Sequence, residues 1–199
     1  MSVVKAQPTR ELQLFHPRTR RAWREWLAKH HATSPGVWLV VDKKGSGQQT
    51  LAYEAVVEEA LCFGWIDGKA NTIDATRFKV LYKPRNPKSG WSAVNKRRVE
   101  RLIDAGLMAP AGLAKIEEAK RNGAWSSLDA AESLAMPDDL GKALRANKRA
   151  AETYARWAPS SKKVLLAWIT SAKRPVTRAK RVAEVVRRAA RGGKASDRG

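Results

Sequence analysis

The sequence predicts an α+β fold, in which a small, mainly antiparallel sheet packs against helices and is followed by a helical C-terminal segment. Three observations predict it. Segment 37–41 is a short apolar run rich in β-formers, and segments 65–73 and 77–83 are predicted to be two further strands joined by a short turn. The segments between them repeat their apolar residues at helical spacing. From Pro137 onward the pattern is helical throughout.

The first elements are a helix over 18–30 and a strand over 37–41. The helix has an apolar stripe at helical spacing, formed by Trp23, Trp26 and Leu27. The Pro35–Gly36 pair breaks that helix, and the apolar run 37–41 predicts a buried strand. The glycine-rich loop 44–47 lacks the Gly-Lys-Ser/Thr of a Walker phosphate loop.

A second helix is predicted over 52–63, ended by Gly64. Its inner stripe is expected to be Tyr53, Val56, Val57, Ala60 and Leu61. The acids on the opposite side, Glu54, Glu58 and Glu59, are interpreted as a solvent-exposed face, and an alternative is that Glu54 and Glu58 share a cation.

Two strands, 65–74 and 77–83, follow and are joined by a short turn. Phe78, Val80 and Tyr82 share one face of the second strand by alternation. Gly68 follows an acid within the first strand, which suggests a β-bulge or a close approach of another backbone segment.

Helices are then predicted after Ser92, as an N-cap, and from Pro110 to Asn122–Gly123. Segment 126–136 is expected to be a linker. A further helix is capped by Ser160–Ser161, and a last helix starts near Pro175. One arc of that last helix is apolar and consists of Val176, Ala179, Val182, Ala183, Val186 and Ala190.

The charge is the unusual property of this chain. Lys and Arg number 39 against 19 Asp and Glu in 199 residues, which gives a formal net charge of +20. The excess is concentrated in 77–101 and 171–199. A blocky positive charge favours a surface that faces a polyanion such as nucleic acid, with Arg178, Arg181 and Arg188 of the last helix as phosphate contacts. The alternative is solubilising charge spread over the surface.

Composition excludes several other classes of protein. The single cysteine, Cys62, rules out an internal disulfide framework and a cysteine-based zinc finger, and it is expected to be buried. Three histidines leave little for a metal site, and neither a metal nor a cofactor is expected. No segment has the length of a membrane span, and the start has no apolar signal region, so a cytoplasmic location is expected.

The densest cluster of chemically useful side chains predicts an anion-binding pocket. A strand-end arginine, a helix N-terminus and aromatic side chains would form it, with an aspartate as base or hydroxyl acceptor. Its candidate residues are Trp65, Asp67, Arg77, Arg85, Trp91, Ser92 and Asn95. The alternatives are core packing for the tryptophans, an Asp67 salt bridge to Arg77 or Arg85, and a purely capping Ser92.

The run Ala60 to Gly68 resembles the central motif of the YdeI/OmpD-associated family of bacterial proteins. Further similarity lies in Pro84-Arg85, Trp91-Ser92 and the stretch from Pro110 to Leu113, and a helical module of the same family resembles the C-terminal part. The resemblance spans about 10–192. One departure is Leu81-Tyr82-Lys83 before Pro84, where the family pattern reads Arg-Phe-Thr.

The resemblance implies an α+β core over 10–128, a helical module over 135–192 and a role in protection against bacteriocins, and the residues at 1–9 and 193–199 predict flexible tails. The resemblance implies no reaction, so whether the chain is an enzyme stays open, as does its oligomeric state. Three functions are weighed: nucleic-acid or other polyanion binding, a site for a small anionic metabolite at the 62–95 cluster, and an interaction module whose helical C-terminal part docks on an acidic partner.

Overall fold

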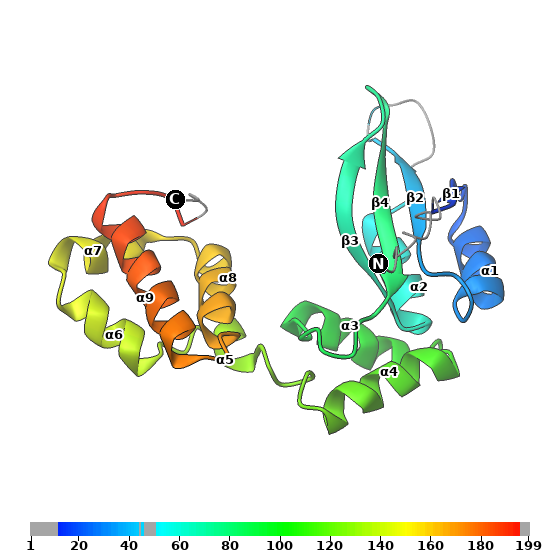
Figure 1. Ribbon diagram of the computed structural model, residues 1–199. Helices are drawn as coiled ribbons and strands as arrows, with labels where there is room; N and C mark the ends of the chain where they lie inside the picture. The colour runs from blue at the N-terminus through cyan, green and yellow to red at the C-terminus, as the bar shows by residue number, and fades with distance from the viewer. Residues whose placement is uncertain (1–11, 44, 46–50, 196–199) are drawn as a thin grey trace, which may run out of the picture. The chain divides into compact units, whose positions relative to one another are not determined.

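The computed structural model describes residues 12–43, 45 and 51–195. Its contacts divide the chain into two compact units (Figure 1). The first unit is Met1–Ser89 with Val94–Gly123, and the second is Gly90–Ala93 with Ala124–Gly199. In the described part of the chain, no helix is both long and apolar enough to cross a membrane.

The first unit is built on a four-stranded sheet with helices packed against it, which confirms the α+β prediction. The strand order is β1-β2-β4-β3, with β1 parallel to β2 and the other pairs antiparallel. Its elements are β1 (Leu14–Phe15), α1 (Arg20–His30), β2 (Val37–Asp42), α2 (Tyr53–Cys62), β3 (Trp65–Thr72), β4 (Arg77–Pro84), α3 (Ala93–Asp104) and α4 (Pro110–Arg121). The prediction missed β1, because two residues are too few to show an alternation.

One face of this sheet is covered by α1 and α2 and forms the core (Figure 1). Val37, Leu39, Val80 and Tyr82 point to that face and are at most 5% exposed. The Trp23 ring meets the Tyr82 ring edge-on at 5.5 Å, and its indole nitrogen donates to the carbonyl of Val56 at 3.0 Å. The tryptophan stripe predicted for the first helix therefore faces the sheet, as expected.

The prediction of a solvent-exposed acidic face on α2 is confirmed for Glu54, whose side chain is 79% exposed, and is wrong for Glu58 and Glu59. Glu59 is 3% exposed and accepts hydrogen bonds from Arg20 at 2.5 Å and Arg24 at 2.7 Å, while Glu58 pairs with Arg20 and Arg101. The arginines of α1 lie over this side of α2 and satisfy the carboxylates, as a buried charge requires. Tyr53, in contrast, was expected inside and is 54% exposed.

Helix α4 approaches the end of α2 so closely that only glycine fits between them. A Cβ at Gly112 would lie 2.2 Å from the carbonyl oxygen of Cys62. The amide of Ala109 donates to that same oxygen at 3.0 Å, which fixes the start of α4 against it. Cys62 is fully buried here, as predicted.

The second unit is helical, as predicted for the C-terminal part. It contains α5 (Asp129–Glu132), α6 (Asp138–Arg145), α7 (Lys148–Arg156), α8 (Pro159–Thr170) and α9 (Pro175–Ala190). Segment 126–136 is not only a linker, because α5 lies within it and buries Ala131 in the core. Helix α8 begins at Pro159 with Ala158 as its N-cap, so the prediction of Ser160–Ser161 as its cap is wrong.

The apolar arc of α9 also differs from the prediction. Its buried residues are Val182, Val185 and Ala189, whereas Val176 is 67% exposed. Alanines and valines occur on several sides of this helix, so the sequence pattern alone does not define which side faces α6, α7 and α8.

Candidate functional site

The face of the sheet opposite α1 and α2 presents a tryptophan with basic neighbours. Trp38 of β2 pairs in register with Leu81 of β4, and Val40 pairs with Lys79. Side chains directly opposite each other in a ladder share a face, so Trp38, Lys79 and Leu81 point away from the core. All three are half-buried rather than buried.

A bulge in β3 adds a second lysine to this face. Asp67 pairs with Tyr82 and Ala70 with Val80, so Gly68 and Lys69 together lie opposite the single residue Leu81. The bulge predicted at Gly68 is therefore confirmed. An extra residue in one strand re-aims its side chains, and here it places Lys69 across Leu81 from Trp38.

Two ammonium groups flank the indole of Trp38. The Lys79 nitrogen lies 4.8 Å from the ring centroid and the Lys69 nitrogen 5.7 Å from it. Lys83, two residues beyond Leu81 on β4, has the same orientation by alternation and is exposed. We call Trp38, Lys69, Lys79, Leu81 and Lys83 the open face.

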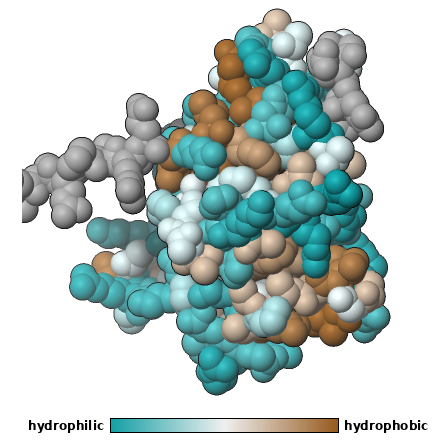
Figure 2. All heavy atoms as spheres, turned by 90° about the vertical axis from the view of Figure 1, so that its right-hand side faces the viewer, coloured by the Kyte–Doolittle hydropathy of each residue, from teal (hydrophilic) through white to brown (hydrophobic). Residues whose placement is uncertain are grey.

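A hollow of about 260 Å³ lies beside Trp38 and is lined by Leu12, Leu14, Trp38 and Lys79. Leu14 of β1 is 57% exposed and pairs in register with Trp38, so it contributes an apolar wall on the same side. Seen from the side of β1 and α1, apolar and polar surface alternate over the first unit (Figure 2). The open face thus combines an aromatic ring, cations and a hollow whose walls include both leucine and lysine side chains.

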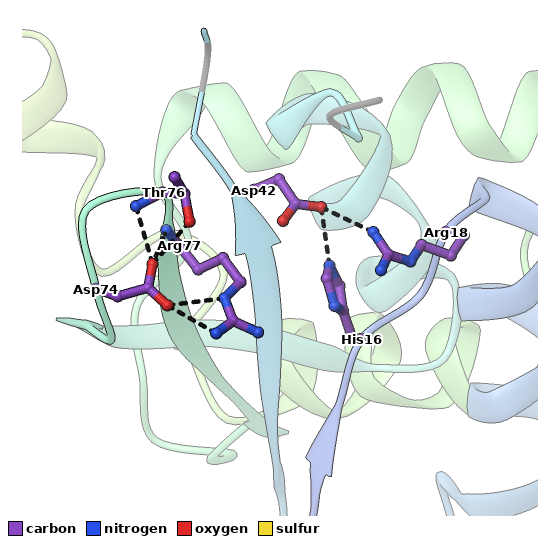
Figure 3. A network of polar contacts seen from close by, with 6 residues as sticks. All are labelled: His16, Arg18, Asp42, Asp74, Thr76 and Arg77. Carbon is purple, nitrogen blue, oxygen red and sulfur yellow. Dashed lines mark hydrogen bonds and ion pairs between the residues drawn. The ribbon is translucent and has the colours of Figure 1, made fainter. Parts of the chain in front are cut away.

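The carboxylates near the hairpin end of the open face are already engaged by basic groups (Figure 3). Asp42 accepts from His16 at 2.9 Å and from Arg18 at 3.3 Å. Asp74 accepts hydrogen bonds from Arg77 at 2.7 Å and from Thr76. These hydrogen bonds hold the pKa of Asp74 well below its usual range, and the one from Arg77 has the largest effect. The lysines of the open face are therefore not offset by these acids.

The residues of the predicted anion pocket are only partly brought together. Asp67 and Arg85 belong to the first unit and interact electrostatically, and Asp67 accepts a hydrogen bond from the Tyr53 hydroxyl at 2.8 Å. Asn95 accepts from Arg98 at 3.0 Å. Tyr53 and Arg98 also belong to this cluster but were not predicted. Tyr53 lies at the start of α2 and Arg98 in the middle of α3, and neither position has a sequence motif that marks a binding residue.

Burial and charge shape the protonation of this Asp67 cluster. Burial, together with the Asp67 hydrogen bond and charge, raises the pKa of Tyr53 to about 12. Burial lowers the pKa of Arg85 to about 10, against the opposing charge of Asp67. Burial and the Asp67 charge also raise the pKa of Tyr82. At neutral pH the tyrosines are thus neutral donors and Arg85 a cation.

The other predicted pocket residues take structural positions. Trp65 is 1% exposed and donates its indole N–H to the carbonyl of His31 at 3.1 Å. Trp91 and Ser92 belong to the second unit, where the Trp91 ring packs on Trp125 at 5.1 Å. Arg77 pairs with Asp74 and not with Asp67.

The three arginines predicted to contact phosphates are engaged within the second unit. Arg178 makes a two-pronged contact to Asp139, at 2.6 and 3.0 Å. Arg188 binds Glu184 at 2.6 Å. Arg181 donates to the Trp168 carbonyl and the Ser171 hydroxyl and stacks over the Trp168 ring, 5.1 Å from its centroid.

In residues 12–43, 45 and 51–195, no three His, Cys, Asp or Glu side chains are grouped closely enough to hold a metal ion.

Two protein-family models match the chain, one over most of the first unit and one within the second. Residues 15–115, more than half of the chain, match a family model described as "Domain of unknown function (DUF8412)". The chain belongs to the DUF8412 family. Residues 133–192 match a second model, described as "Bacteriocin-protection, YdeI or OmpD-Associated", which confirms that resemblance. No curated protein and no solved structure matches the chain significantly.

The open face lies entirely within the DUF8412 region, as does the Asp67 cluster. Arg178, Arg181 and Arg188 lie within the YdeI/OmpD-associated region. The description of the first region gives no activity, so the function has to be argued from the geometry of the site.

Proposed function

We propose that the chain binds nucleic acid through the open face of its sheet. The observation that supports this most is the position of Trp38, whose ring is flanked by Lys69 and Lys79 on a surface not covered by α1 or α2. An aromatic ring with two cations close to it offers stacking to bases and charge to phosphates at once.

The charge distribution supports the same proposal. Lys79 and Lys83 belong to the basic block 77–101. The acids Asp42 and Asp74 are engaged by His16, Arg18 and Arg77. The predicted arginines of α9 fit less well, because binding a phosphate would compete with Asp139 and Glu184 for Arg178 and Arg188.

Binding to a mixed-sequence single strand over a salt series tests the proposal. Three lysine–phosphate contacts predict a log–log slope of about −2 or steeper, so affinity falls roughly tenfold or more between 50 and 200 mM salt. Fluorescence anisotropy of a labelled oligonucleotide measures this. Absence of binding at moderate salt would contradict the proposal and leave the charge of +20 with a solubilising role.

The cellular setting is part of the proposal. The description of the family matched by residues 133–192 names bacteriocin protection. We propose that this chain acts in such protection from the cytoplasm, where it meets nucleic acid. Cells that lack the chain are then expected to survive bacteriocin exposure less well than cells in which it is restored, and equal survival would contradict this setting.

A second candidate function is binding of a small anionic metabolite at the Asp67 cluster. It is favoured by the grouping of Asp67, Tyr53, Arg85 and Arg98 in one electrostatic network. Asp67→Asn distinguishes the two functions. It removes the negative charge that acts on Tyr53 and Arg85 and weakens a metabolite site, whereas it leaves nucleic-acid binding at the open face intact.

A further inference from the structure

The chemistry of the open face indicates whether it binds single-stranded or double-stranded nucleic acid. Trp38 lies on the surface of a four-stranded sheet, with a hollow lined by Leu12, Leu14 and Lys79 beside it and the ammonium groups of Lys69 and Lys79 at 5.7 and 4.8 Å from its ring centroid. From this geometry we infer that the open face is a site for single-stranded nucleic acid, on which one base stacks against Trp38. This inference rests on the proposed function and specifies its ligand.

The preference for a single strand follows from the accessibility of base faces. In a duplex the faces of the bases are stacked on one another, so a ring on a sheet surface cannot reach them without unstacking. A single strand can splay a base onto an aromatic side chain. A duplex would therefore gain only the contacts of its phosphates with Lys69, Lys79 and Lys83.

An incoming base has to compete with the lysines for Trp38, and the typical free energies of the two kinds of contact favour the base. An exposed cation–π contact contributes roughly 0.5–1 kcal/mol. Stacking of a base on an aromatic side chain contributes about 1–3 kcal/mol. The displaced ammonium group of Lys79 or Lys69 ends a flexible side chain and can move to a phosphate beside the same base. It then exchanges its contact with the ring for an ion pair with that phosphate.

The hollow beside Trp38 provides room for the base at its edge. Leu14 is 57% exposed and aligned with Trp38, so a stacked base would also cover this leucine and the Leu12 wall. The open face therefore fits a ligand with three properties: a flat ring, negative charge next to that ring, and a base that is not paired. A strand of DNA or RNA has all three.

The test compares oligonucleotides with the same number of phosphates. The ligands are an oligothymidine, an abasic strand of the same length and a duplex of half that length, each measured with the full chain at several salt concentrations. The variants are Trp38→Leu, which keeps an apolar side chain without a ring, and Trp38→Phe, which keeps a smaller ring. Circular dichroism and thermal unfolding check that both variants fold as the parent does.

The expected result is that the parent binds the oligothymidine about 5- to 100-fold more tightly than the abasic strand, the range that one stacked base supplies. Trp38→Leu should remove most of this difference and leave affinity for the abasic strand and the duplex nearly unchanged. Trp38→Phe should retain part of it.

Three other outcomes would overturn the inference. Equal, salt-dependent binding of all three ligands by the parent would overturn the stacking inference while the proposed function stands. A base preference that Trp38→Leu leaves intact would place the stacking site elsewhere and also overturn it. Failure of the parent to bind any of the three would overturn both.

Discussion

Reversing the charge of the open face is expected to abolish nucleic-acid binding. In the variant with Lys69→Glu, Lys79→Glu and Lys83→Glu, three attractions to phosphates are replaced by three repulsions. An exposed contact between unit charges amounts to about 1 kcal/mol in water, and 1.4 kcal/mol corresponds to a tenfold change. Affinity for a single strand should therefore fall at least about a hundredfold, as measured by anisotropy at moderate salt.

A matched control separates this surface from bulk charge. Lys142, Lys148 and Lys180 are exposed residues of the second unit, and their reversal to Glu changes the net charge by the same amount. This control is expected to reduce affinity by severalfold at most. Equal losses in the two triple variants would show that charge alone, and not the open face, determines binding.

Gly112→Ala is expected to destabilise the first unit strongly. The new Cβ would lie 2.2 Å from the carbonyl oxygen of Cys62 and 2.8 Å from that of Leu61, and both obstacles are backbone atoms. Helix α4 would have to move away from the end of α2, which strains or breaks the hydrogen bond from Ala109 to Cys62. Overpacking of this kind costs roughly 1–3 kcal/mol, and a backbone clash places it at the upper end.

Gly141→Ala provides the comparison for this substitution. Gly141 is also a buried helical glycine, but its added Cβ would meet only side-chain atoms of Arg145 and Met136, at 3.3 and 3.4 Å. Alanine is favoured over glycine in a helix by up to about 1 kcal/mol, so this variant should be neutral or more stable. Denaturant unfolding of both variants checks the contrast, and equal midpoints would contradict the close packing of α4 on α2.

Local sequence signals predicted most of the fold. Signals that depend on a few neighbouring residues predicted α1, β4, α4 and α9, and these elements formed as expected. The signals were the tryptophan stripe of α1, the alternation of Phe78, Val80 and Tyr82 in β4, and the prolines at 110 and 175. The failures involve distant partners. Glu59 was expected to face solvent, because nothing near it in sequence reveals that Arg20 and Arg24 lie over it.

The candidate site was harder to predict than the fold, for the same reason. The run 37–41 is apolar throughout, so its alternation is hidden and Trp38 was interpreted as buried along with its neighbours. Only the register with Lys79 and the bulge at Gly68 show that it faces outward between two lysines. Likewise, Asp139 lies 39 residues before Arg178, and only folding brings them together.

The central claim is that the open face contacts nucleic acid, and lysine protection tests it most directly. The full chain is acylated at its amines with and without a saturating single strand, and the modified lysines are quantified by mass spectrometry. We predict strong protection of Lys69, Lys79 and Lys83 and unchanged modification of Lys142, Lys148 and Lys180. Protection of the second set, with the first set still reactive, would contradict the account.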